Sequence, residues 1–423
     1  MRPSWLDRRQ LPVLLIWSCL LVLPIGRVVE VPVMLMAIAG VYLLVKHWDG
    51  WRRNQAFKLF VCAFLLAWIP ILISLVDAVR WQSTAMMSAN HLRFAFSGIF
   101  ILHVLSNETA HRRFLTLCAW LLLFWVADGL VQLVIGHDLF GFAIPGGERV
   151  NALFGKGLVY GILVAVYCPL LWEHAARTWT RWQVAAVVIA TVTVILAAGA
   201  RSAWISLAVI LIAYVAVLWH RYGRFPLRLV SLTLAGMVIC VAVLWAGSSG
   251  FAGRLENAVG AITGSTAVQA DSIGHRMWIW RGAVNMIEAN PLNGVGAGGF
   301  RYAYPAYTAP GDPFVNASPP IIPSHSHQLW LETLSETGSI GAAGLFAMLV
   351  LLLVAGMRAD APVRRLMLPY GLCLLAAYFP FNTHMAIYSA FWSQTVWWLI
   401  ALYCAAYGAG IARASPGEQR TSS

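Results

Sequence analysis

The chain has 423 residues, of which 60% are hydrophobic and only 11% are charged. Ordinary soluble domains are about 45–50% apolar and about 25% charged. This composition excludes a soluble enzyme, a disordered protein and a nucleic-acid-binding protein. At about 20 apolar residues per crossing, the chain could cross a bilayer about a dozen times and keep one sizeable loop. Backbone groups in lipid must bond internally and the alternating pattern of a barrel is absent, so we predict an all-α polytopic membrane protein.

Twelve apolar runs in chain order are predicted to be transmembrane helices. They cover residues 11–26, 31–45, 57–76, 92–106, 114–136, 157–172, 183–199, 203–219, 229–247, 339–356, 365–380 and 388–409. We therefore divide the chain into 1–247 with helices one to nine, 248–337 as one large loop with short helices of its own, and 338–423 with helices ten to twelve and the C-terminus.

The charge distribution predicts the orientation in the membrane. The formal net charge is +12, from 29 Lys and Arg against 17 Asp and Glu. An even number of crossings puts both termini on one side, and assigning that side to the cytoplasm places most of the basic residues there. This agrees with the retention of positive charge on the cytoplasmic side. We expect both termini to be cytoplasmic and the loop 248–337 to lie outside.

The first half of this loop contains a predicted helix over 271–291. Asp271 or Ser272 can cap its start, and Pro291 marks its end. Arg276 falls in the first turn, where the helix dipole also favours an anion. The alternative is an arginine that only lies beside interfacial tryptophans. The glycine-rich run 293–299 lacks the strand–turn–helix context of a dinucleotide site, so we predict a tight turn.

The second half of the loop ends in Ser-His-Ser-His-Gln, residues 324–328, before a predicted amphipathic helix over 326–337. His325 and His327 lie at its start. Imidazole can take a proton near neutral pH without special tuning, although both histidines could instead only hydrogen-bond to the helix N-terminus. The pair is too little for a metal site. Glu332 and Glu336 share one helix face, which we expect to be solvated.

Two ionisable residues at or within the predicted spans are also candidates. Arg201 lies in a short break between two apolar runs, and Asp128 lies inside the fifth run. Ionisable groups at such depths are costly and often functional. Arg201 could instead be an ordinary headgroup-level arginine, and Asp128 could pair with Arg93. No Asp-x-Asp motif and no Walker loop occurs, so a diphosphate would have to be bound by arginines.

Three motifs of the sequence together resemble those of a known family. His327-Gln328, nine residues, Gly338, two residues and Gly341 match the His-[Asn/Ser/Gln]-x9-Gly-x-x-[Gly/Thr/Tyr] signature of O-antigen ligases. Arg201-Ser202 after a run of small residues is similar to a second motif of that superfamily. The helix with Arg276 that ends in Pro291-Leu-Asn-Gly294-Val-Gly296 resembles a third. The resemblance covers roughly residues 195–345, and the superfamily also contains O-antigen polymerases and bacterial protein O-oligosaccharyltransferases.

The resemblance implies a GT-C-like glycosyltransferase in the bacterial inner membrane, with a periplasmic active site. The implied donor is a glycan on undecaprenyl pyrophosphate, and the implied acceptor is the lipid A–core in the membrane. No cofactor, metal or nucleic acid is implied. His327 would be the catalytic base, with His325 as the less favoured candidate, and Arg201 and Arg276 would bind the pyrophosphate. Supporting roles fall to Asp128, Arg281, Gln328, Gly338 and Gly341.

Three other functions stay open on the sequence. A polymerase would extend the lipid-linked chain, although the His-x9-Gly spacing favours a ligase. A protein O-oligosaccharyltransferase would use a Ser or Thr acceptor. A lipid-linked sugar transporter would need a polar cavity across the membrane. At mid-membrane depth, however, the predicted spans contain only Asp128 and a few neutral polar residues.

Overall fold

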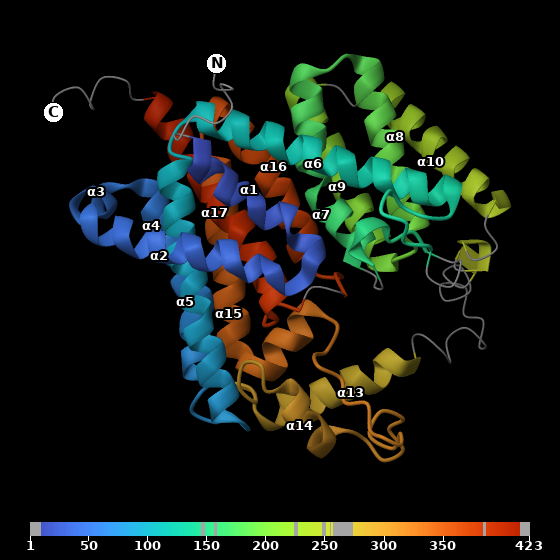
Figure 1. The fold of residues 1–423 in the computed structure, drawn as a ribbon. Helices are drawn as coiled ribbons and strands as arrows, with labels where there is room; N and C mark the ends of the chain where they lie inside the picture. Colours follow the sequence, from blue (N-terminus) through green and yellow to red (C-terminus); the bar gives the residue numbers. More distant parts are fainter. Residues whose placement is uncertain are drawn as a thin grey trace. The chain divides into compact units, whose positions relative to one another are not determined.

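The computed structural model describes residues 10–144, 149–155, 159–223, 227–247, 251–253, 255–256, 274–383 and 386–414. Within these ranges the regular structure is helical (Figure 1), apart from one isolated bridge between His137 and Ala143. The prediction of an all-α chain is confirmed.

Each predicted apolar run corresponds to a helix. These helices are α1 (Leu11–Leu21), α2 (Glu30–Lys46), α4 (Gln55–Ile73), α5 (Trp81–Val104), α6 (Glu108–Ile135), α7 (Val159–Thr178), α8 (Arg181–Ala197), α9 (Arg201–Tyr222), α10 (Leu227–Gly247), α15 (Leu329–Arg358), α16 (Ala361–Tyr378) and α17 (Ala390–Ala414). Among the described residues, seven helices are long and apolar enough to cross a membrane. The polytopic character is supported, and the number of twelve crossings stays a prediction.

Local sequence signals fix several helix ends. The Asn54 side chain accepts a hydrogen bond from the Phe57 N–H at 3.1 Å and so caps α4. Thr180 and Gln183 form a reciprocal capping box at the start of α8. These contacts satisfy backbone donors that a helix leaves unpaired in its first turn.

The chain divides into two compact units that are interleaved in the sequence. Unit 1 comprises 1–114, 270–368 and 383–423, and unit 2 comprises 115–269 and 369–382. In unit 1, α2 packs along α5, α15 along α4, and α17 along both α4 and α5. Arg93 of α5 donates to Glu30 of α2 at 3.0 Å. The pairing of Arg93 with Asp128 that the sequence left open is therefore wrong.

In unit 2, α7 packs against α8 and α9. Asp128 of α6 is buried, and its carboxylate accepts from the N–H groups of Leu139 and Leu153 at 2.9 and 3.1 Å. One turn later, Gln132 accepts from the Asn151 and Ala152 N–H groups at 2.9 and 2.8 Å. These two polar side chains of α6 hold the segments on either side of residues 145–148.

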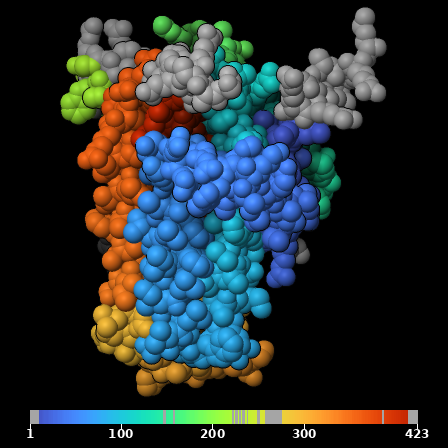
Figure 2. All heavy atoms as spheres, turned by 90° about the vertical axis from the view of Figure 1, so that its left-hand side faces the viewer, coloured from blue at the N-terminus to red at the C-terminus, as the bar shows by residue number. Residues whose placement is uncertain are grey.

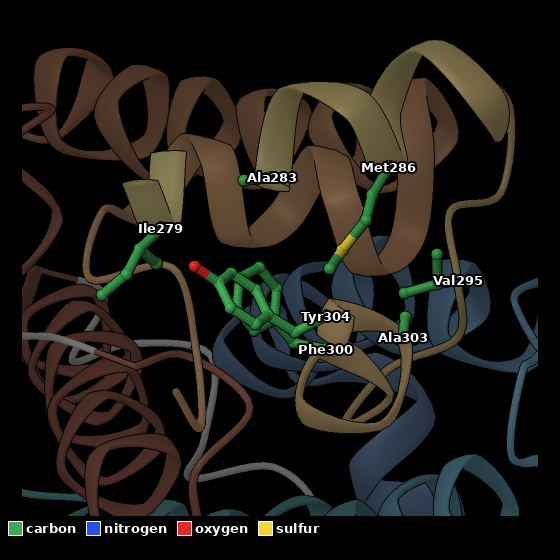
Figure 3. Packing of buried hydrophobic residues seen from close by; sticks show 7 residues of the cluster. All are labelled: Ile279, Ala283, Met286, Val295, Phe300, Ala303 and Tyr304. Atoms are coloured by element: carbon green, nitrogen blue, oxygen red, sulfur yellow. The ribbon is translucent and has the colours of Figure 1, made fainter. Parts of the chain in front are cut away.

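The part of unit 1 that leads to the histidines contains α13 (Gly274–Ala289) and α14 (Phe300–Tyr307). The proposed caps Asp271 and Ser272 lie outside the described residues. The two helices bury one apolar cluster (Figure 3), formed by Ile279, Ala283, Met286, Val295, Phe300, Ala303 and Tyr304. Tyr304 also donates to Asp312 at 2.7 Å. Apolar burial of this kind gives a segment of short helices a core of its own.

The predicted tight turn over 293–299 is confirmed, and together with residues 291 and 292 it interlocks with α15. Four backbone hydrogen bonds of 2.8–3.1 Å join them: Val295 N–H to Ser335 O, Gly296 N–H to Glu336 O, Ser339 N–H to Pro291 O, and Ile340 N–H to Leu292 O. The last two are possible because α15 is broken at Gly338, which has a φ of 65°. A Cβ at Gly338 would lie 2.2 Å from the Leu292 carbonyl carbon.

The same turn is held from its other side by the loop between α4 and α5. Val79 N–H donates to Val295 O at 3.0 Å, and Asn293 Nδ2 donates to Asp77 Oδ2 at 2.7 Å. Ala297 N–H donates to the Ser74 hydroxyl at 3.2 Å. In Figure 2 the gold and orange segment accordingly lies at the end of the helical column that contains α4 and α5. The turn therefore ties α13 and α14 to three helices of unit 1.

We expect Gly338→Ala to destabilise the protein more than Gly26→Ala. Both glycines have a φ of +65°, but nothing lies within 4 Å of a Cβ at Gly26. Gly26→Ala should cost only the left-handed strain, about 1–2 kcal/mol, whereas Gly338→Ala adds overpacking of about 1–3 kcal/mol. Thermal unfolding of both variants in the same detergent checks this. Equal losses of thermal stability in the two variants would contradict the close backbone contact at Gly338.

Candidate functional site

The segment that carries the two histidines is fixed by hydrogen bonds on both sides. Trp280 Nε1 of α13 donates to the Ser326 carbonyl oxygen at 3.1 Å. The Ser326 side chain is fully buried and donates to the Gln328 carbonyl at 2.9 Å. Gln328 Oε1 accepts from the Leu331 N–H at 2.5 Å and caps α15. The helix therefore begins at Leu329, three residues later than predicted, because Gln328 ends the extended segment.

The two histidines predicted as base candidates lie together. Their ring centroids are 4.0 Å apart, and the ring of His325 also contacts the Ser324 hydroxyl, with 2.9 Å between Nδ1 and Oγ. His327 has a φ of 55°, which is unusual for a residue with a side chain. A position in this region is maintained only where surrounding contacts determine it.

Arg276 and His327 both belong to unit 1, and the charge of Arg276 acts on His327. Arg276 lies in the first turn of α13, as predicted, is half-buried, and donates from Nη1 to the Thr383 hydroxyl at 3.1 Å. Burial and the positive charge of Arg276 lower the pKa of His327 below the ordinary value of 6.5. Both causes disfavour the imidazolium ion. The neutral imidazole of His327 is thus favoured near neutral pH.

The other predicted basic residues are placed differently. Arg201 belongs to unit 2, where it is the exposed first residue of α9. Arg281 is exposed on α13, and its guanidinium carbon lies 6.0 Å from the centroid of the Trp278 ring. The roles of Arg201, Arg281 and Asp128 in a reaction stay predictions.

The glycines of the motif have a physical explanation. Gly338 permits the break in α15. The backbone N–H groups that follow this break bind the carbonyl oxygens of Pro291 and Leu292. A Cβ at Gly341 would lie 1.8 Å from the Thr337 hydroxyl oxygen, which itself contacts the Tyr388 hydroxyl at 2.7 Å. The residues between His327 and Gly338 therefore form one short stretch of helix. This stretch connects the histidine segment to the backbone contact between α15 and the turn 291–299.

The expectation of a solvated face for Glu332 and Glu336 is wrong. Both residues are 1% exposed. The turn 291–299 covers Glu336, whose carboxylate accepts from the Gly298 N–H. Glu332 accepts from the Tyr388 N–H at 3.3 Å, in the segment before α17. The helical spacing of Glu332 and Glu336 indicates that they share one face. It does not indicate that the turn 291–299 and the segment before α17 cover this face.

Two contact residues of the site were not assigned from the sequence. Trp280 is one of the tryptophans near Arg276 in the sequence, and its indole N–H could have suggested a partner for a buried carbonyl. Thr383 lies between α16 and α17, more than a hundred residues after Arg276, and no motif marks it. Within the described ranges, no group of three or more His, Cys, Asp and Glu residues could hold a metal ion.

Comparison with known proteins agrees with the motif assignment. The family model described as O-antigen ligase matches residues 185–346. This range includes Arg201, α13, the turn 291–299 and the whole stretch from His327 to Gly341. A search of curated proteins finds no match for this chain. The match over residues 185–346 supports membership of the chain in the O-antigen ligase family.

Proposed function

We propose that the protein transfers an O-antigen polysaccharide from undecaprenyl pyrophosphate to a sugar hydroxyl of the lipid A–core, at the periplasmic face of the bacterial inner membrane. The family and the apolar helices support a membrane glycosyltransferase. The observation that carries the finer proposal is the bond from α13, the helix of Arg276, to the peptide before the half-buried His327, whose pKa is lowered by burial and by the charge of Arg276. One group can bind a diphosphate and the other can accept a proton.

The proposed reaction is a single displacement with inversion. His327 takes the proton of the acceptor hydroxyl as its oxygen forms a bond to the anomeric carbon of the donor. The bond from that carbon to the diphosphate oxygen breaks, and the diphosphate leaves with the electron pair. Arg276, with Arg201 as the second predicted ligand, stabilises the negative charge. Planar guanidinium groups suit phosphate oxygens and stay charged at all relevant pH values.

Related reactions differ in the acceptor and in what accumulates when the protein is lost. A strain without a ligase should accumulate lipid-linked polymer together with core-only lipopolysaccharide. Loss of a polymerase would leave core with single repeat units, and loss of a transporter would trap the donor inside the cell. A protein O-oligosaccharyltransferase would instead leave its Ser or Thr acceptors unmodified.

We expect His327→Ala to lower the transfer rate about 10²- to 10⁴-fold, the usual contribution of general-base catalysis. The measurement is transfer by purified protein between the two lipid substrates, with a chelator present because we propose that arginines supply the positive charge. Donor affinity should change little, since Arg276 is retained.

His325→Ala is the matched control, because the two imidazole rings lie together. Only His327, on which the charge of Arg276 acts, is the proposed base. Its loss of rate should be clearly smaller. If His327→Ala transfers normally, or if His325→Ala is the more damaging change, the assignment of the base is wrong.

The pH dependence of kcat/KM provides a second prediction. The neutral base is required, so activity should be constant near neutral pH and fall only as the pH drops through the lowered pKa of His327, below 6.5. In Arg276→Gln one cause of this lowering is gone while burial remains. The acidic limb of the residual activity should therefore move to higher pH, and an unchanged limb would contradict the electrostatic contact.

A further inference from the structure

Trp280 connects the helix that carries Arg276 to the segment that carries His327. It lies one helical turn after Arg276 on α13, and it is half-buried. Ile279, Ala283 and Met286 bury a neighbouring face of the helix in the apolar cluster, which fixes the rotation of α13. Arg276 can then bind Thr383 while Trp280 binds the Ser326 carbonyl, at 3.1 Å in both cases.

The carbonyl that Trp280 binds belongs to the peptide unit that also contains the His327 nitrogen. A peptide unit is planar and moves as one body. Holding the Ser326 oxygen therefore fixes the direction in which the chain enters His327, whose φ of 55° is a conformation that L-residues rarely adopt. The buried Ser326 side chain holds the carbonyl of Gln328, two peptide units further along the chain, so the backbone is bound both before and after His327.

We propose that Trp280 is a positioning residue whose indole N–H holds His327 at a fixed separation from Arg276. This inference rests on the proposed function, because it assumes that a base and a diphosphate-binding group must act on one substrate. Displacement reactions depend steeply on the alignment of the reacting groups. A bond from the helix that carries Arg276 to the backbone of the base couples the two positions directly.

The test compares Trp280→Phe and Trp280→Gln with Trp68→Phe. Phenylalanine keeps an aromatic ring without the N–H, whereas the glutamine amide keeps a donor without the ring. Trp68 is the matched control, because its half-buried indole makes the same kind of bond, to the Ser88 carbonyl at 2.9 Å between α4 and α5. Its loss should affect stability without reaching the site.

We expect kcat to fall about 5- to 10-fold in Trp280→Phe, the range given by the loss of one hydrogen bond, with little change in donor KM. Trp280→Gln should retain more activity than Trp280→Phe, because the donor matters more than the ring. The acidic limb of the kcat/KM profile should move to higher pH in Trp280→Phe. The charge of Arg276 on α13 acts on His327, and the titratable ring of His325 lies against the His327 ring. Trp68→Phe should keep the wild-type kcat and profile.

Two results would overturn the proposal. One is a Trp280→Phe enzyme with wild-type kcat and pH profile, and the other is a Trp280→Gln enzyme that is less active than Trp280→Phe, which would indicate packing alone. If Trp280→Phe does not fold, a folded and active Trp280→Gln still supports the bond, and an inactive one contradicts it. Failure of the proposed function is distinguishable, because His327→Ala would then remain active whatever the Trp280 variants do.

Discussion

Close backbone contact between the turn 291–299 and the broken helix α15 is the constraint on which the described site depends. Its hydrogen bonds run in both directions, and they require Gly338 to adopt a left-handed conformation against the Leu292 carbonyl. The loop between α4 and α5 holds the same turn from the other side. The segment that precedes α15 is thereby joined at fixed positions to α15 and to the loop between α4 and α5. Gly338 is thus explained by the close approach of the Leu292 backbone, and Gly341 by the close approach of the Thr337 side chain.

The chemistry follows from what this framework holds. Because α13 ends in the turn and the histidine segment leads into α15, the interlock sets the positions of both sides of the site. Arg276 lies beside His327, and its charge and the burial of the imidazole together favour the neutral base. A strained backbone at His327 is maintained by bonds from Trp280 and Ser326. Strain at a functional residue is expected where the surroundings determine its conformation.

The sequence predicted the helices, the tight turn, and the position of His325 and His327 at the start of a helix, because these depend on local periodicity and on Gly and Pro. It did not predict Thr383 as the partner of Arg276, or the burial of Glu332 and Glu336. These depend on contacts between segments that are far apart in the chain, and a helical face alone does not say what covers it. The pairing of Asp128 was missed for the same reason, since its partners are backbone N–H groups, which no side-chain pattern reveals.

The most direct test of the account is an experimental structure of the protein with a non-transferable polyprenyl diphosphate glycan. We predict that diphosphate oxygens lie within hydrogen-bonding distance of the Arg276 guanidinium, and that the anomeric carbon faces His327 with room for an acceptor hydroxyl between them. A diphosphate bound away from Arg276, or an anomeric carbon turned away from His327, would contradict the central claim.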